Sequence, residues 1–368
     1  MQDRLKIVFM ALVKAGLWKR IPQDELHYFP LSDEDWQVIY NNAIAQTVDV
    51  LVYEGILCLP TNLLPPKQAI LKWTARVDRV ERYNKKMQAT LVHLFNLVGD
   101  VADKIVLLKG FGLAANYINP LGRISGDIDL YFENKESLIQ FKDILEKKNI
   151  KINIGDHNSI YFQFKGFEFE GHTQMLDIFN PFVKSKVDRL IKNESQQYIK
   201  LDLGGAKLRT PSYLLTQIQA NAHILKHYLG FGIGLRQFCD VARLCAVRPE
   251  KFDGLYLQKW YKDLGILKWM NVVHHFLVAE LGLEQKYLPF SLMENESSKW
   301  LLADVLATGN FGFHDIRFQD SQARIEERNE SRSEISKRVL PHILKGLKYS
   351  PSETFWYPIM KAISKINR

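Results

Sequence analysis

The chain has 368 residues, of which 46% are hydrophobic and 24% are charged, and its formal net charge is +8. This composition is ordinary for globular proteins and excludes a largely disordered chain, and no apolar run reaches the roughly 18–20 residues that span a bilayer. The length predicts two domains, or one domain with a large appendage. No motif pairs the three cysteines, so we expect no disulfides and a cytoplasmic protein.

Residues 1–104 are expected to be helical. The first twenty residues have an apolar centre interrupted by charges and no small-residue cleavage site, which favours an amphipathic helix over a signal peptide. Apolar residues then recur every three or four positions across 36–51, and a proline-containing segment precedes one or two long helices within 67–103.

Residues 105–210 combine short strands and helices. The two types alternate at first and strands then follow one another, which predicts a small α/β module with a mixed sheet. We expect strands at 105–110, 126–132, 150–155, 159–166, 167–171 and 173–179, helices at 111–118 and 136–148, and a hairpin at 201–210.

Residues 211–368 return to helices, with Thr210 as the expected N-cap of the first helix and Pro211 at its first position. The polar stretch 318–337 is either a loop or the exposed start of a helix. The predicted class is therefore α+β, a small mixed-sheet core flanked by N- and C-terminal helical regions. The helices expected after the core are 212–229, 236–247, 257–282 and 300–309.

The positive charge is concentrated near the C-terminus, where seven basic side chains between positions 337 and 368 face Glu353 alone. Such a tail attracts phosphates or anionic membranes and slightly favours an anionic partner. The solvated face of a helix is the alternative explanation, because apolar residues between 356 and 366 recur at helical spacing.

In the stretch GRISGDIDLYF (122–132) two aspartates share one face of an expected strand. Alternate residues of a strand point the same way, so Asp127 and Asp129 lie together while Ile128 and Leu130 pack on the other face. Two carboxylates held close repel each other, and a divalent cation removes that penalty. The pattern predicts a metal site, and an exposed edge strand with two solvated aspartates is the alternative.

Two neighbouring features favour the metal site. The stretch KGFG (109–112) ends one strand and opens a helix, whose N-terminal N–H groups suit the phosphates of a nucleotide. Asp177, in the apolar stretch MLDIF, offers a third carboxylate that would complete a two-metal site for displacement at phosphorus. A residue at a strand edge is the alternative interpretation of Asp177.

These residues carry a resemblance to known proteins. A strand, a glycine turn and a helix, followed by GDIDL and a third acid, resemble the nucleotidyltransferase superfamily that includes DNA polymerase β. More closely, LLKGFGLAANYINPLGRISGDIDLYF (107–132) resembles a family of uncharacterised bacterial nucleotidyltransferases, which is recognised by LLKG, a tyrosine, an arginine and DIDL. The helical segments 36–56 and 222–245 support this resemblance, which covers about residues 30–250.

The resemblance implies metal-dependent transfer of a nucleoside monophosphate from a nucleoside triphosphate, with ATP as the expected donor, to a hydroxyl acceptor with release of pyrophosphate. Asp127 and Asp129 would hold two Mg²⁺ or Mn²⁺ ions, and Asp177 would complete the metal nearer the acceptor and help to deprotonate its hydroxyl. The implied contacts to the triphosphate are the backbone of Gly110 and Gly112, Lys109 as a point charge and Arg123 as a bidentate fork.

Several alternatives remain open. The acceptor is a small molecule, a protein side chain or an RNA end. The alternative function is that of a catalytically weak nucleotide- or partner-binding protein in a toxin–antitoxin or regulatory pair. This alternative is suggested by Lys109-Gly110-Phe111, which stands where the superfamily usually has Gly-Ser.

Three further patterns lie beyond residue 220. His223 and His227 have the i, i+4 spacing of metal ligands, but we interpret them as packing or cleft-lining residues because the sequence offers no evident third ligand. Arg236 and Asp240 are expected to form an ion pair. GFGIG (230–234) has no preceding strand and is not interpreted as a dinucleotide-binding turn.

Overall fold

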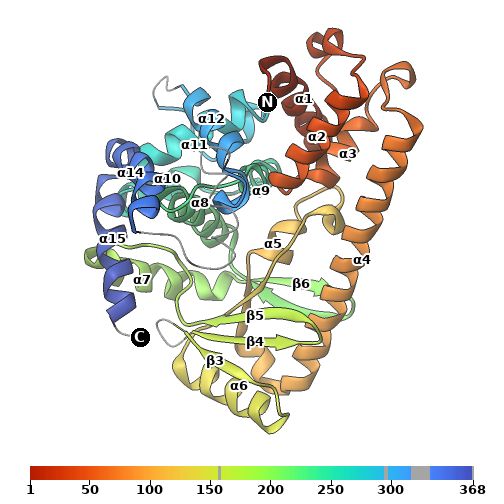
Figure 1. The fold of residues 1–368 in the computed structure, drawn as a ribbon. Coiled ribbons are helices and arrows are strands. Elements are labelled where there is room, and N and C mark those ends of the chain that lie inside the picture. Colours follow the sequence, from red (N-terminus) through yellow and green to blue (C-terminus); the bar gives the residue numbers. More distant parts are fainter. Residues whose placement is uncertain (156–158, 294–296, 316–331, 367–368) are drawn as a thin grey trace.

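The computed structural model describes residues 1–155, 159–293, 297–315 and 332–366 (Figure 1). Within these ranges every strand lies between Ile105 and Thr210, and helices precede and follow the strands. The predicted α+β class, a small mixed sheet flanked by helical regions, is therefore confirmed.

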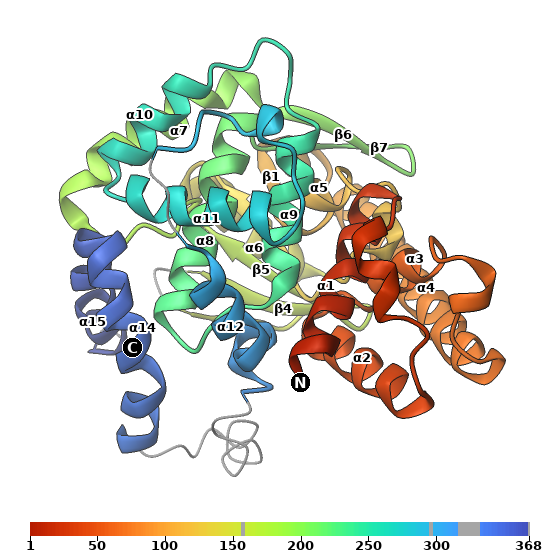
Figure 2. The same cartoon turned by 90° about the horizontal axis from the view of Figure 1, so that it is seen from above.

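Helices surround the sheet. In both views α1–α4 lie on one side of the molecule and α14 and α15 on the opposite side (Figures 1 and 2). The helices are α1 (Asp3–Trp18), α2 (Asp33–Ala45), α3 (Asp49–Ile56), α4 (Lys67–Val98), α5 (Gly110–Ala114), α6 (Lys135–Lys147), α7 (Lys184–Glu194), α8 (Tyr213–Leu229), α9 (Leu235–Ala246), α10 (Gly254–Asp263), α11 (Leu267–Ala279), α12 (Lys299–Thr308), α14 (Arg332–Tyr349) and α15 (Pro351–Ile366).

The sheet has seven strands in the order β3-β4-β5-β2-β1-β7-β6. The pairs β2–β5 and β1–β7 are parallel and the other neighbouring pairs are antiparallel, so the sheet is mixed as predicted. The expected hairpin is formed by the last two strands. The strands are β1 (Ile105–Leu108), β2 (Ile128–Phe132), β3 (Ile152–Ile154), β4 (Ile160–Phe164), β5 (Phe167–His172), β6 (Ile199–Leu203) and β7 (Ala206–Thr210).

Strand β2 shows how the sheet separates two apolar cores. Ile128, Leu130 and Phe132 pack into the core shared with α4 and α6. Tyr131 packs into the other core, which the N- and C-terminal helices form together. Because side chains alternate along a strand, Asp129 points to the same face as Tyr131. Asp129 and the aliphatic residues Ile128 and Leu130 thus lie on opposite faces of the sheet, as predicted.

The strand predicted at 173–179 is wrong. After β5 the chain continues without regular structure, and the Ile178 N–H donates to the Leu176 carbonyl at 3.0 Å, which closes a tight turn. Met175 and Leu176 both pack into the same core, whereas neighbouring residues of a strand face opposite sides. Helix α7, which was not predicted, follows this segment.

The predicted start of the first C-terminal helix is also wrong, by two residues. Ser212 is the N-cap of α8, and its Oγ accepts a hydrogen bond from the Leu215 N–H at 3.3 Å. Thr210 instead ends β7, where its hydroxyl donates to the Ile199 carbonyl at 3.3 Å.

Two expected segments in the C-terminal region, 257–282 and 318–337, have different outcomes. The helix expected at 257–282 is divided into α10 and α11 at Gly265, whose φ is 75°. Most of the polar stretch 318–337 lies outside the described residues. In the described part of the chain, no helix combines the length and the apolar character needed to cross a membrane.

Candidate active site

A cleft of about 1430 Å³ lies on the Asp129 face of the sheet. Its lining includes Lys109, Gly110, Arg123, Asp127, Asp129 and Asp177, which are six of the seven predicted site residues. The seventh, Gly112, lies against β7, where an added Cβ would meet the Thr210 side chain at 3.6 Å. The fold therefore brings together most of the residues that the sequence singled out, from β1, β2 and the segment after β5.

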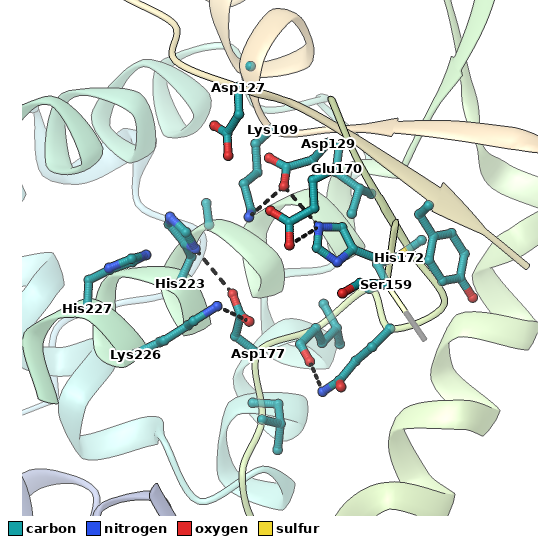
Figure 3. A pocket seen from close by; sticks show the side chains of 18 of the residues that line it. Lys109, Asp127, Asp129, Ser159, Glu170, His172, Asp177, His223, Lys226 and His227 are labelled. Atoms are coloured by element: carbon teal, nitrogen blue, oxygen red, sulfur yellow. Dashed lines mark hydrogen bonds and ion pairs between the residues drawn. The ribbon is translucent and has the colours of Figure 1, made fainter. Parts of the chain in front are cut away.

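Lys109 occupies the turn between β1 and α5 in an unusual conformation. Its φ of 47° and ψ of −132° are rarely adopted by a residue with a side chain, and such strain costs on the order of 1–3 kcal/mol. The following Gly110 also has a positive φ, of 32°, which glycine tolerates readily. This turn directs the ammonium group into the cleft, 3.5 Å from Asp129 Oδ1 (Figure 3).

The charge of Lys109 is stabilised by the carboxylates around it. Burial lowers the pKa of its ammonium group, but Asp129, Asp177 and Asp127 outweigh that effect and raise the pKa above its ordinary value. Lys109 therefore stays positively charged in the cleft, beside Asp129 and under the electrostatic influence of Asp177 and Asp127.

Asp127 and Asp129 differ in their surroundings although they are two residues apart. Asp127 precedes β2 and is exposed, yet the cleft walls displace water from its carboxylate, and this desolvation and the charge of Asp129 raise its pKa. Asp129 is only 6% exposed. Burial would raise its pKa, but Lys109 and a hydrogen bond from His172 hold the pKa below its usual value.

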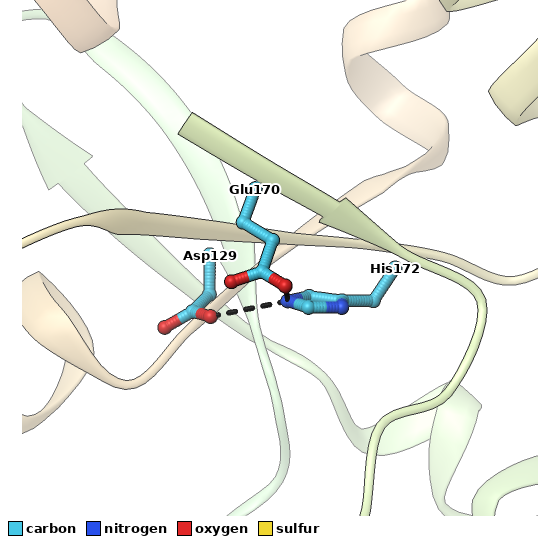
Figure 4. A group of neighbouring side chains, drawn as sticks. All are labelled: Asp129, Glu170 and His172. Atoms are coloured by element: carbon cyan, nitrogen blue, oxygen red, sulfur yellow. Dashed lines mark hydrogen bonds and ion pairs between the residues drawn. The ribbon is translucent and has the colours of Figure 1, made fainter. Parts of the chain in front are cut away.

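Asp129 belongs to a compact group of three potential metal ligands. The parallel pairing of β2 and β5 sets Asp129 beside Glu170, and His172 follows on the same face of β5. His172 Nε2 lies 3.2 Å from Asp129 Oδ1 and 3.5 Å from Glu170 Oε1 (Figure 4). One ligand atom from each of the three residues lies within 4.8 Å of the others.

Asp177 lies in the same cleft but has different partners. Its carboxylate accepts a hydrogen bond from Lys226 at 2.8 Å and lies 3.1 Å from His223 Nδ1, both on α8 (Figure 3). Burial raises the pKa of Asp177, but Lys226 and His223 reverse this and hold it well below the usual value. The metal-ligand role implied for Asp177 stays a prediction, because in this arrangement a lysine already neutralises it.

Arg123 is engaged by a buried carboxylate. Its Nε and Nη2 each donate to Asp240 at 2.7 Å, and Tyr117 donates to the same carboxylate at 2.8 Å. The phosphate contact implied for Arg123 stays a prediction. The expected Arg236–Asp240 pair is wrong, because Arg123 reaches Asp240 across the fold and the Arg236 guanidinium donates to the Ile124 carbonyl.

Glu170, His172, His223 and Lys226 complete the candidate site, and the sequence patterns predicted no metal or catalytic role for any of them. For the first two a signal existed: FEFEGH alternates apolar and polar residues, which places Glu170 and His172 on one face of a strand. Lys226 had no such signal, because its position beside Asp177 depends on the packing of α8.

The donor set of this cleft fits a divalent cation. Carboxylate oxygens suit hard cations such as Mg²⁺ and Mn²⁺, and an imidazole nitrogen beside them suits Mn²⁺ better than Mg²⁺. Asp127, Asp129 and Glu170 together carry more negative charge than Lys109 balances. A cation in this part of the cleft would relieve their repulsion.

Comparison with known proteins agrees with this geometry. A family model described as "Uncharacterised nucleotidyltransferase" matches residues 32–278, which includes the whole sheet and helices α2–α10. Searches of curated proteins and of solved structures gave no match.

Proposed function

Because the chain belongs to the family of uncharacterised nucleotidyltransferases, we propose that it transfers a nucleoside monophosphate from a nucleoside triphosphate to a hydroxyl acceptor, with release of pyrophosphate. The observation that carries this proposal is the convergence of Asp129, Glu170 and His172 within 4.8 Å in a cleft that Asp127 and Lys109 also line.

In this proposal the strand carboxylates bind Mg²⁺ or Mn²⁺. Asp127 and Asp129 are the principal ligands, and Glu170 and His172 complete the ligand set on the β5 side. A divalent cation bound there supplies charge neutralisation for the phosphates during phosphoryl transfer.

The cationic and acidic side chains on either side have separate tasks. Lys109, which stays protonated, contacts the phosphates of the donor, and ATP is the expected donor. Asp177 lies across the cleft with His223 and Lys226, and it orients the acceptor hydroxyl and receives its proton. The acceptor is a small molecule, a protein side chain or an RNA end.

The first test is metal-dependent binding of the donor. Unfolding is followed with each of the four nucleoside triphosphates, in Mg²⁺, in Mn²⁺ and in EDTA, and pyrophosphate release is then measured with pools of small-molecule, protein and RNA acceptors. We expect stabilisation only with nucleotide and metal together, by about 2.7 kcal/mol when the nucleotide is at 100 times its Kd. Equal stabilisation in EDTA would contradict a metal-dependent site. Binding without pyrophosphate release from any pool would favour the alternative, a nucleotide- or partner-binding protein.

A further inference from the structure

One wall of the cleft carries three aromatic rings, of which the proposed chemistry involves only His223, through its hydrogen bond with Asp177. The ring centroids of His223 and His227 on α8 lie 4.3 Å apart, and that of Phe311 lies 4.3 Å from His227. All three side chains are half-buried and line the cleft. They therefore present partly open ring surface to whatever occupies it.

Phe311 is held in place by a strained turn. It lies in the 3₁₀ turn Asn310–Gly312 with a φ of 52° and a ψ of 26°, a left-handed conformation that a bulky residue adopts at a cost. Backbone strain of this kind persists where the surroundings determine the conformation, and it is common where a side chain serves a ligand. The position of the ring is thus fixed before any ligand arrives.

The surroundings that fix this turn include the GFGIG stretch. A Cβ on Gly234 would come within 2.9 Å of the Asn310 backbone, and one on Gly312 within 2.2 Å of the Phe231 carbonyl. Arg338 of α14 donates to the Gly312 carbonyl at 2.8 Å. Gly234 and Gly312 therefore allow the two loops to pack closely and present Phe311 to the cleft.

Two uncharged polar groups line the cleft at the turn that carries Phe311. The terminal amides of Gln237 on α9 and of Asn310 are 3.2 Å apart, and both residues line the cleft. An amide offers both hydrogen-bond donors and an acceptor, as the edge of a nucleobase does. A ring surface with amides beside it suits a planar, uncharged heterocycle better than it suits a phosphate.

The same wall adjoins the acids. His223 Nδ1 is 3.1 Å from Asp177, and His223 and His227 lie across the cleft from Glu170 and His172 (Figure 3). A nucleotide whose phosphates lie at Lys109 and the strand carboxylates can therefore extend its base toward α8.

We propose that the wall formed by His223, His227 and Phe311, with the amides of Gln237 and Asn310, binds the base of the donor nucleotide. This inference rests on the proposed function, because it takes the donor's phosphates to lie at the carboxylates. Stacking favours a purine, which offers the larger ring surface.

The test distinguishes binding of the base from binding of the phosphates. Binding of ATP and of inorganic tripolyphosphate, both with Mn²⁺, is measured by calorimetry for the wild type, Phe311→Ala and Phe182→Ala. Phe182 is 77% exposed and is not part of the cleft lining, so its variant is the matched control. Truncation of a stacking ring should weaken ATP binding about 10- to 100-fold in Phe311→Ala. The affinity for tripolyphosphate should change less than twofold, and the control should bind both ligands as the wild type does.

A second variant keeps the turn intact. His227→Ala changes the ring surface without altering the strained turn, and it should weaken ATP binding in the same direction with tripolyphosphate unaffected. If both variants bind ATP with wild-type affinity, the base site is overturned. The same conclusion holds if the two variants raise the KM of an acceptor but leave ATP binding unchanged. Failure of the wild type to bind either ligand with metal would overturn the proposed function itself, and the base site with it.

Discussion

Asp129 and Asp177 lie in the same cleft, but their charges are balanced in different ways. Asp129 lies with Asp127, Glu170 and His172 in what we call the strand group, and among the described residues its one lysine partner is Lys109. Asp177 has a lysine of its own, at 2.8 Å. The strand group therefore has a surplus of negative charge that favours a metal ion, whereas Asp177 is already neutralised.

The two acids are also held by different parts of the chain. Asp129 is fixed by its own strand, which pairs with β1 and β5 on either side. Asp177 lies in irregular backbone, and the next residues are tied to the C-terminal helix: Glu353 accepts hydrogen bonds from the N–H groups of Phe179, at 2.6 Å, and Asn180, at 3.1 Å. The acid on the strand is fixed locally, and the other depends on distant segments.

The largest expected effect is that of Asp129→Ala. It removes the acid at the centre of the strand group, and loss of metal-based charge stabilisation worth several kcal/mol lowers kcat by roughly a thousandfold. Pyrophosphate release measures the effect, and the matched control is Asp143→Asn, a change of an exposed aspartate on α6. Wild-type activity in Asp129→Ala, with urea unfolding unchanged, would remove the strand group from the mechanism.

Asp177→Asn should separate the two acids. A positioned base contributes roughly 10²-fold or more, so kcat should fall about 100-fold, while the Mn²⁺ concentration for half-maximal activity should stay within twofold of the wild type. A large rise in the Mn²⁺ requirement would show that Asp177 is a metal ligand, as the family resemblance implies, and would reverse the assignment made from its lysine partner.

Glu353→Gln tests how the Asp177 segment is held. Burial raises the pKa of Glu353 to about 7 from an ordinary 4.5. The folded state therefore binds the proton more tightly, and this contribution to stability is present below pH 4.5 and is lost as the pH rises through about 7. Each pKa unit corresponds to about 1.4 kcal/mol, so at most about 3 kcal/mol is involved.

Urea unfolding at several pH values measures this contribution. Between pH 5 and pH 8 the free energy of unfolding of the wild type should fall relative to that of Glu353→Gln, in which position 353 does not titrate. Parallel pH profiles for the two proteins would contradict a raised pKa at Glu353.

The sequence predicted the two aspartates at β2 better than it predicted the opposite wall of the cleft or the Glu170 and His172 partners on β5. Alternation along 126–132 was sufficient to place Asp129 on the face opposite Ile128, because strand periodicity is a local property. The same reasoning failed at 173–179, where adjacent Met175 and Leu176 pack into the same core and a tight turn replaces the strand.

Partners from distant parts of the chain could not be read from local patterns. Arg123 pairs with Asp240, 117 positions away, and Lys226 reaches Asp177 across 49 positions. Both pairs depend on how α8 and α9 pack against the sheet. The spacing of Arg236 and Asp240 on one helix suggested a pair. In the folded chain it is instead the guanidinium of Arg123 that contacts the Asp240 carboxylate.

The most direct test of the account is Mn²⁺ binding to the cleft in the presence of ATP, measured by electron paramagnetic resonance for the wild type, Glu170→Gln and Asp177→Asn. Glu170 lies in the strand group, so its substitution should weaken Mn²⁺ binding about tenfold, whereas Asp177→Asn should bind as the wild type does. Unchanged affinity in Glu170→Gln together with lost affinity in Asp177→Asn, or no Mn²⁺ binding by the wild type, would contradict a metal site built on β2 and β5.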